Sequence, residues 1–308
     1  MLEIDKIINQ YASAHLTKQD FFAEMNKRYS TLMEFCPFLE NNFIDRIYIS
    51  SNGVEFRTRY GCHFLNAHSD HYYPPKGAIS LGNSTVPELD LMMAFMKDCR
   101  IVFDIGANIG WMSIHFANRY PDKQIYSFEP ILPTYETFLK NISCNPGVKN
   151  IQYYNLGFAE KPGEFDFFYY PNIPAASSLK NDNYHENVVL LKCSILTLDD
   201  FTQKEEVSPD FIKIDVEGAE LPLLQGGLRT ITENKPILFV EMLRKWSAKF
   251  GYHPNDIIQL LTPLEYHCFS LEGNKIKPFL HMREDSVEKD FVFLHGSKHA
   301  KLIAENKL

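Results

Sequence analysis

The segment from residue 101 to residue 129 constrains the fold of this chain more than any other part of the sequence. A short apolar run of strand type leads into a tight turn with three special positions, Gly106, Asn108 and Gly110. A helix-like segment follows, and the next apolar run ends in an acid, Glu129. Glycines in such a turn let a ligand approach the backbone closely, because a Cβ atom would block it. The pattern predicts the first half of a nucleotide-type α/β unit, which binds an adenosine-bearing cofactor.

Strand-like and helix-like segments alternate along the rest of the chain, which favours a parallel sheet covered by helices. The expected strands of this sheet are 101–105, 125–128, 151–156, 211–215, 237–241, 266–270 and 291–294. Helices are expected at 88–97, 111–120, 134–142, 219–231 and 255–261. Two further strands, 164–170 and 188–195, flank an irregular loop. The alternation predicts one α/β domain over residues 86–308.

The first 85 residues carry a different pattern, which predicts an N-terminal extension. Apolar residues recur at helical spacing up to about residue 45, at Ile4, Ile7, Ile8 and Tyr11 and again at Phe21, Phe22, Met25 and Tyr29. Residues 47–59 indicate a β-hairpin with Asn52 and Gly53 in its turn, and residues 60–86 are expected to form loop. We expect this helical and β-hairpin extension to contact the substrate or to form a homodimer.

Composition limits the partners of the chain. It is expected to be globular, with 45% hydrophobic and 23% charged residues, and its net charge of −8 disfavours binding to nucleic acid. No run of about 20 apolar residues predicts a membrane span, and the first residues do not resemble a signal peptide. The six cysteines form no Cys-x-x-Cys pair, which favours a reduced cytoplasmic protein. A further cluster consists of His63, His68, Asp70 and His71. The run from His68 to His71 could ligate a metal or act on the substrate, but a surface loop is the commoner outcome.

Asp104, near the end of the first expected strand, helps to distinguish between NAD and S-adenosylmethionine as the adenosine-bearing cofactor. Asp104 would repel the diphosphate of a dinucleotide, and the turn lacks the Gly-x-Gly-x-x-Gly spacing of that class. S-adenosylmethionine carries an ammonium and a sulfonium instead, so Asp104 could pair with its amino group while Glu129 accepts the hydroxyl hydrogens of the ribose. The residues favour S-adenosylmethionine over NAD, and an NAD-dependent oxidoreductase stays open as an alternative.

Several ordered motifs give the chain a resemblance to a known family. They are Asp104-Ile-Gly-Ala-Asn-Ile-Gly110, Phe128-Glu-Pro130, Thr197-Leu-Asp-Asp200, Ile212-Lys-Ile-Asp-Val-Glu-Gly-Ala-Glu220 with Gln225-Gly-Gly227, and the strand from Pro236 to Glu241. Over roughly residues 85–295 the chain resembles the FkbM family of S-adenosylmethionine-dependent methyltransferases. The resemblance implies a Rossmann-like class I methyltransferase fold, with a seven-stranded, mostly parallel sheet whose last strand is inserted antiparallel. It also implies O-methylation, often of sugars or natural-product hydroxyls.

Three acids, Asp215, Glu217 and Glu241, come at or just after the ends of strands that are expected to be neighbours. Because ligands of open α/β sheets bind at the carboxyl ends of the strands, these carboxylates could converge on one catalytic site. Asp215 is a candidate general base, and the three acids together are a candidate Mg²⁺ or Ca²⁺ site. The alternative for Glu217, and the favoured role for Glu220, is capping of the following helix, whose N-terminus attracts acids.

The candidates for cofactor binding are Asp104, Gly106, Asn108, Gly110, Glu129, Leu156, Gly157 and Glu88. Asp104 could instead brace the turn, and Asn108 could adopt a left-handed conformation or bond the carboxylate of the cofactor. Leu156 and Gly157 are placed to border the adenine, unless they are ordinary core. Glu88 could reach the methionine end of the cofactor or be an exposed acid of a first helical turn.

Together these expectations describe a cytoplasmic O-methyltransferase. It would move a methyl group from S-adenosylmethionine to a hydroxyl of a small-molecule or carbohydrate acceptor, such as a sugar, nucleotide-sugar or glycan. A general base would add about 10²–10⁴-fold, because a sugar hydroxyl must lose its proton. N-methylation of a small amine, NAD-dependent oxidation and a non-catalytic cofactor-binding subunit remain as alternatives.

Overall fold

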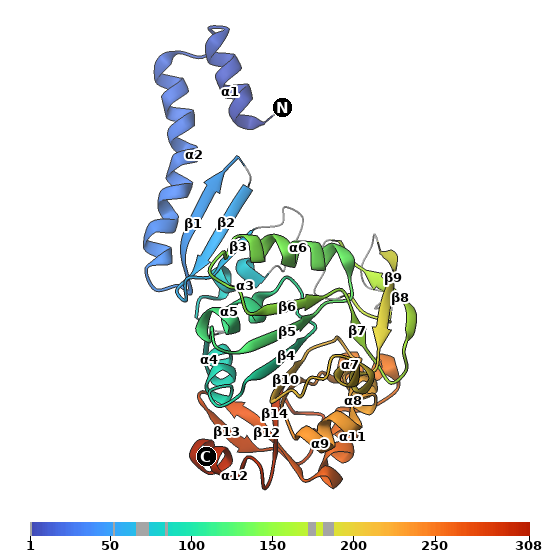
Figure 1. The fold of residues 1–308 in the computed structure, drawn as a ribbon. Helices are drawn as coiled ribbons and strands as arrows, with labels where there is room; N and C mark the ends of the chain where they lie inside the picture. Colours follow the sequence, from blue (N-terminus) through green and yellow to red (C-terminus); the bar gives the residue numbers. More distant parts are fainter. Residues whose placement is uncertain (1, 52, 66–73, 84–85, 172–176, 181–187) are drawn as a thin grey trace.

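A computed structural model of the chain describes residues 2–51, 53–65, 74–83, 86–171, 177–180 and 188–308. An eight-stranded sheet runs through the body of the molecule (Figure 1). In spatial order its strands are β6 (Ile151–Tyr154), β5 (Gln124–Phe128), β4 (Ile101–Ile105), β10 (Phe211–Ile214), β11 (Ile237–Glu241), β14 (Asp290–His295), β12 (Tyr266–Glu272) and β13 (Lys275–Pro278).

The predicted strands of this sheet are all present. The first five in spatial order are parallel, while β14 lies antiparallel between β11 and β12. The antiparallel insertion of the last strand is therefore confirmed. The sheet has eight strands rather than seven, because the chain turns back after β12 at Gly273 and adds β13 along the edge.

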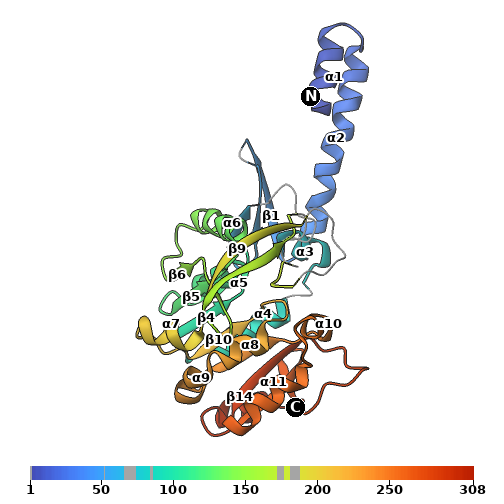
Figure 2. The same cartoon turned by 90° about the vertical axis from the view of Figure 1, so that its right-hand side faces the viewer.

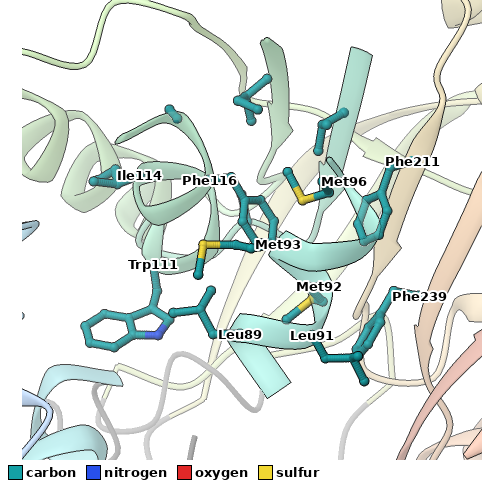
Figure 3. Packing of buried hydrophobic residues seen from close by; sticks show 14 of the residues in the cluster. Leu89, Leu91, Met92, Met93, Met96, Trp111, Ile114, Phe116, Phe211 and Phe239 are labelled. Atoms are coloured by element: carbon teal, nitrogen blue, oxygen red, sulfur yellow. The ribbon is translucent and has the colours of Figure 1, made fainter. Parts of the chain in front are cut away.

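Side chains of the buried strands alternate between two apolar cores, because successive residues of a strand point to opposite faces. Phe211 packs in the first core and Ile212 in the second. The helices that pack in the first core are α4 (Val86–Phe95), α5 (Trp111–Arg119) and α6 (Leu132–Ser143). Figure 3 shows this core, to which α4 supplies Met92 and Met93 and the sheet supplies Phe211 and Phe239. Each such side chain stabilises the fold by about 1.5–3 kcal/mol when it is fully buried.

The second core is covered by α7 (Leu198–Lys204), α8 (Glu220–Gln225), α9 (Leu228–Asn234) and α11 (Pro254–Leu261). The single helix predicted at 219–231 is wrong, because the chain breaks between α8 and α9. A Cβ atom at Gly226 would lie 2.2 Å from the carbonyl oxygen of Ala159, so the helix ends where another segment crosses it. The remaining C-terminal helices are α10 (Arg244–Ser247), η2 (Ala248–Phe250), η3 (Thr262–Leu264) and α12 (Ala300–Asn306).

A small second sheet stands beside the carboxyl ends of the central strands. It consists of β7 (Gly157–Phe158), β9 (Val189–Leu196) and β8 (Gly163–Tyr169), in that spatial order. The strands predicted at 164–170 and 188–195 are β8 and β9, and they pair antiparallel. Phe167 and Ile195 pack against Ile131 of the main body, which holds this sheet next to the central one.

The N-terminal region contains α1 (Glu3–Ala12), α2 (Lys18–Leu39), β1 (Ile44–Ser50), β2 (Gly53–Thr58), β3 (His63–Leu65) and α3 (Pro74–Leu81). The predicted helices and hairpin are present, and α1 and α2 project from the body as a two-helix arm in both views (Figures 1 and 2). The prediction of loop at 60–86 is wrong for β3 and α3. Strand β3 is held by tertiary bonds, because the N–H groups of His63 and Leu65 donate to the side chains of Asn145 and Asn141.

Two sequence-based expectations stay untested by the fold. The division into domains at residue 85 stays a prediction, since β3 bonds directly to the region of α6. His68, Asp70 and His71 lie outside the described residues. Among the residues that the structure describes, no helix has both the length and the apolar character needed to cross a membrane.

Candidate active site

A cavity of about 120 Å³ lies at the carboxyl ends of β4, β5 and β10. The turn after β4, the end of β5 and the loop after β10 line one side with Gly106, Asn108, Glu129, Asp215, Val216 and Glu217. The small sheet lines the opposite side with Gly157, Phe158, Phe167 and Ile195. We call this space the first cavity; it lies at the edge of the sheet where the sequence predicts a bound ligand.

The turn after β4 is shaped by close packing. Gly106, Asn108 and Gly110 all have left-handed φ values, of 79°, 51° and 81°. A Cβ atom at Gly106 would lie 1.8 Å from the carbonyl oxygen of Asp215, and one at Gly110 would lie 2.1 Å from the ring of Phe138. The glycines are therefore required, but the reason predicted from the sequence is incomplete. Their missing side chains make room for neighbouring protein atoms, and close approach of a ligand to these glycines stays a prediction.

Glu129 is buried at the floor of the first cavity. Its Oε2 accepts the N–H of Asn108 at 2.9 Å, and its Oε1 accepts the N–H of Ile131 at 2.9 Å. Burial raises the pKa of Glu129 to about 7, against the opposing effect of these two hydrogen bonds. Since a carboxylate oxygen can accept more than one hydrogen, both oxygens keep capacity for a ligand.

Asp104 lies behind the first cavity rather than on its surface. It is fully buried, accepts a hydrogen bond from the hydroxyl of Ser113 at 2.5 Å, and lies 3.6 Å from Nζ of Lys213. The structure favours the bracing role for this acid, although through a side chain and not through backbone N–H groups. Because Lys213 offsets its charge, the sequence argument that Asp104 repels a diphosphate loses its force.

Four other cofactor candidates differ in their placement. Gly157 lines the first cavity, whereas the neighbouring Leu156 packs against the second apolar core. Gly110 is the residue immediately before α5, and its backbone lies close to the ring of Phe138. Glu88 lines a different cavity on the far side of Asp215. Contact of Leu156, Gly110 and Glu88 with the cofactor stays a prediction.

The carboxyl groups of Asp215, Glu217 and Glu241 come together, with one oxygen of each within 4.8 Å of the others. Burial, followed by the charge of Asp215, raises the pKa of Glu241 to about 10 and the pKa of Glu217 well above its ordinary value. Glu217 has a left-handed φ of 53°, and its buried Oε2 accepts no hydrogen bond from the described residues. Such a cluster favours a cation or a hydrogen-bond donor as its ligand.

Glu220 supports the loop that carries the cluster. Its Oε1 accepts the N–H groups of Val216 and Gly218, and its Oε2 accepts the hydroxyl of Tyr252 at 2.8 Å. The favoured prediction of helix capping is close to this arrangement, because Glu220 is the first residue of α8. The acid braces the residues that precede the helix.

Two lysines that the sequence analysis missed reach the cluster. Lys213 donates to Asp215 at 3.1 Å and to the carbonyl of Gly106 at 3.2 Å. Lys289 lies 3.0 Å from Asp290 and 4.0 Å from Glu241. A lysine between two isoleucines of a buried strand was a visible signal for Lys213. Lys289 and Asp290 reach this edge only because β14 is antiparallel and therefore begins where β11 ends.

A second cavity, of about 250 Å³, lies on the other side of Asp215. Charged residues line one part of it: Glu88, Lys213, Asp215, Glu241, Lys289 and Asp290. Trp111, Met112 and Phe239 line another part, and α3 of the N-terminal region contributes Pro74, Gly77, Ala78 and Leu81. Asp215 is thus shared by both cavities.

The order of the strands, the antiparallel β14 and the cavities at the carboxyl ends define a Rossmann-like class I methyltransferase fold. The model of the methyltransferase FkbM domain matches residues 104–268, which is more than half of the 308 residues. The chain belongs to the FkbM methyltransferase family.

Three proteins with methyltransferase names are similar to the chain. The methyltransferase sdnD of Sordaria araneosa is 29% identical over 153 residues, covering 41% of this chain and 59% of that protein. The hexuronic acid methyltransferase AglP of Haloferax volcanii is 25% identical over 192 residues, covering 62% of this chain and 73% of that protein. The chain therefore spans less than two thirds of the length of sdnD. A crystal structure of methyltransferase FkbM from Methylobacillus flagellatus is 18% identical, with a TM-score of 0.41, and covers 64% of this chain and 44% of that chain.

Proposed function

We propose that the chain is an S-adenosylmethionine-dependent O-methyltransferase that acts on a hydroxyl of a sugar, nucleotide-sugar or glycan. The observation that carries the proposal is the position of Asp215 between the two cavities. The first cavity would hold the methyl donor and the second the acceptor. The name of the relative AglP, a hexuronic acid methyltransferase, supports a sugar acceptor.

The residues around the first cavity fit the donor. Glu129 would accept the two ribose hydroxyls, because each of its oxygens has so far accepted only one backbone N–H. Gly157 and Phe158 would border the adenine, and the turn at Gly106 and Asn108 would border the methionine part. Asp104 would act indirectly, by holding Ser113 and Lys213 in place.

Asp215 is the proposed base. Lys213 holds its Oδ2, and its Oδ1 accepts no hydrogen bond from the described residues. When bound, S-adenosylmethionine would supply the methyl group, and its sulfur would keep the electrons of the broken carbon–sulfur bond. Asp215 would take the proton of the acceptor hydroxyl as the hydroxyl oxygen bonds the methyl carbon. Alignment of the two cavities would supply much of the rate, up to about 7–11 kcal/mol in favourable cases. Glu241, which lines the second cavity, would bind an acceptor hydroxyl, whereas Glu217 lines the first cavity.

A divalent cation bound by Asp215, Glu217 and Glu241 stays a prediction. The charge of these acids gives less reason to expect it, because two lysines lie beside them. Lys213 and Lys289 already bring positive charge to the cluster. Activity that survives an excess of EDTA would agree with this view, and loss of activity that Mg²⁺ or Ca²⁺ restores would establish the metal site.

The partner and location of the chain are also proposals. The exposed apolar residues of α1 and α2 support a homodimer through the arm. All six cysteines have free thiols, which supports a reducing compartment such as the cytoplasm.

Calorimetry with S-adenosylhomocysteine and NAD tests the donor. We expect S-adenosylhomocysteine to bind and NAD not to bind. Glu129→Gln should weaken binding by about tenfold or more, because hydrogen bonds to a charged group contribute about 1.5–3 kcal/mol. Glu164→Gln, at an exposed position of β8, is the matched control and should leave affinity unchanged. Binding of NAD, or equal affinity in both variants, would refute the proposed donor site.

A further inference from the structure

The two lysines of the second cavity are already paired with acids. Lys213 lies 3.1 Å from Asp215 and 3.6 Å from the buried Asp104, which is outside the cavity. Lys289 lies 3.0 Å from Asp290. Four carboxyl groups line the cavity beside these two ammonium groups, so acids outnumber cations where the acceptor would bind.

Among the acids that line the second cavity, Glu88 has no ion-pair partner in the described part of the chain. The described residues form no hydrogen bond or ion pair with its carboxylate. Burial, followed by the charge of Asp290, raises the pKa of Glu88 to about 7, and Lys289 offsets only part of this effect. Glu241 is in a similar position, because its nearest cation, Lys289, is 4.0 Å away. Negative charge in the cavity is therefore unfavourable until a further cation enters.

Two features other than charge indicate a ligand. The cavity has an apolar wall that includes Trp111 and Phe239, and a Cβ atom at Gly77 would meet no other atom within 4 Å. The buried and unpartnered Oε2 of Glu217 belongs to the cluster that joins this cavity to the first one. Open space between an apolar wall and hydrogen-bonding acids suits a pyranose ring, which has apolar faces and polar edges.

We propose that the second cavity selects an acceptor of the aminosugar class, with a protonated amine on the molecule that carries the reacting hydroxyl. The ammonium group is held between Glu88 and Glu241, and the hydroxyl faces Asp215. A uronate or a phosphate would add negative charge beside Glu88 and Glu241, whose raised pKa values already reflect an environment that disfavours such charge. Anionic sugars and nucleotide-sugars are therefore disfavoured. The inference rests on the proposed function and narrows its substrate class.

Three glycosides with the same ring show how the charge of the acceptor affects binding while its shape stays nearly constant. They are methyl α-D-glucopyranoside, its 2-amino-2-deoxy analogue and its uronate, each titrated by NMR into the full chain saturated with S-adenosylhomocysteine. We expect the amino glycoside to bind about tenfold more tightly than the uronate, with the neutral glycoside between them. Glu88→Gln should remove most of this difference, whereas Glu164→Gln should keep it.

Each outcome bears on one proposal. Equal or tighter binding of the uronate, an unchanged preference in Glu88→Gln, or no binding of any glycoside would overturn the aminosugar inference. Affinity for S-adenosylhomocysteine is measured in every variant and shows whether the fold and the donor site are intact. If the wild-type chain does not bind S-adenosylhomocysteine, the proposed function fails instead.

Discussion

At the scale of single residues, the buried acids of the site depend on Lys213. Its ammonium group lies within 3.6 Å of Asp104 and 3.1 Å of Asp215. Lys213→Met keeps the apolar stem and removes the charge, which leaves Asp104 buried without a cation. We expect the free energy of unfolding to fall by about 3–5 kcal/mol, as when one partner of a buried pair is removed. Urea denaturation measures the loss.

The matched control for this substitution is Lys192→Met. Lys192 pairs with Asp166 on the surface at 3.1 Å, and both side chains are more than half exposed. An exposed pair of this kind contributes at most about 1 kcal/mol. If the two methionine variants lose the same stability, Lys213 does not have the role described here.

Glu129 gives the site a dependence on pH. Burial raises its pKa to about 7, and Asp104 adds to the increase while Lys213 opposes it. Because the folded pKa lies above the ordinary value of 4.5, the stability that this group contributes is complete below pH 4.5 and is lost as pH rises through about 7. Only the ionised carboxylate accepts two ribose hydroxyls well. Affinity for S-adenosylhomocysteine should therefore rise between about pH 6 and pH 8.

Calorimetric titrations across this interval test the assignment. In Glu129→Gln the affinity should change little with pH. A rise of the same size in wild type and variant would mean that another group titrates.

The convergence of Asp215, Glu217 and Glu241 was predictable, because the carboxyl ends of neighbouring parallel strands meet at one edge. The role of Asp104 was not, since its partner Lys213 lies on a strand more than a hundred residues away in sequence. A local pattern shows which acid ends a strand, but it does not show which cation faces that acid. The burial of Asp104 and its pairing with Lys213 could therefore be seen only in the folded structure.

At the scale of elements, α3 forms a wall of the second cavity and should control the acceptor. Gly77 lies within this helix and faces open space. Gly77→Leu should fill the cavity without weakening α3, because leucine is a better helix former than glycine. We expect glycoside binding and methyl transfer to be lost while affinity for S-adenosylhomocysteine stays the same. NMR titration and calorimetry measure the two effects.

Gly147→Leu is a control for added bulk, because a Cβ atom at Gly147 also meets no other atom within 4 Å and the residue lies outside both cavities. This variant should keep both affinities. Persistent glycoside binding in Gly77→Leu would show that α3 does not form the acceptor wall.

The elements differ in how far the sequence predicts them. The central strands are predictable because their apolar runs are bounded by turn residues and face helices on both sides. The break between α8 and α9 depends on Ala159, which approaches Gly226 from a distant part of the chain. Strand β3 depends on Asn141 and Asn145 in the same way. The positions of these elements depend on tertiary contacts, which the local periodicity of the sequence does not reveal.

At the scale of the whole molecule, the arm of α1 and α2 has too little core of its own. Helix α2 has 22 residues and buries none of them, and α1 buries only Ile7. Both helices expose apolar side chains, which include Ile4, Ile8, Tyr11, Phe22, Tyr29, Leu32, Met33 and Phe38. A helix gains most of its stability from packing an apolar face, so an arm of this kind indicates a partner.

The pattern along α2 favours a second copy of the chain as that partner. Phe22, Tyr29, Met33 and Cys36 are exposed and follow one another at spacings of a heptad seam. Two copies of a two-helix arm would complete a four-helix bundle through a contact that is the same on both sides. In Figure 2 the arm extends well beyond the body, which leaves both of its helices accessible.

Sedimentation equilibrium tests this assembly. The wild-type chain of 35.7 kDa should sediment as a dimer, and Met33→Glu should shift it to the monomer mass, because symmetry places the new charge in the seam twice. Thr31→Glu adds the same charge on the opposite face of α2 and should remain dimeric. Both variants should bind S-adenosylhomocysteine as the wild type does, since the first cavity contains no residue of the arm. A monomeric wild type, or equal dissociation in the two variants, would exclude pairing through this seam.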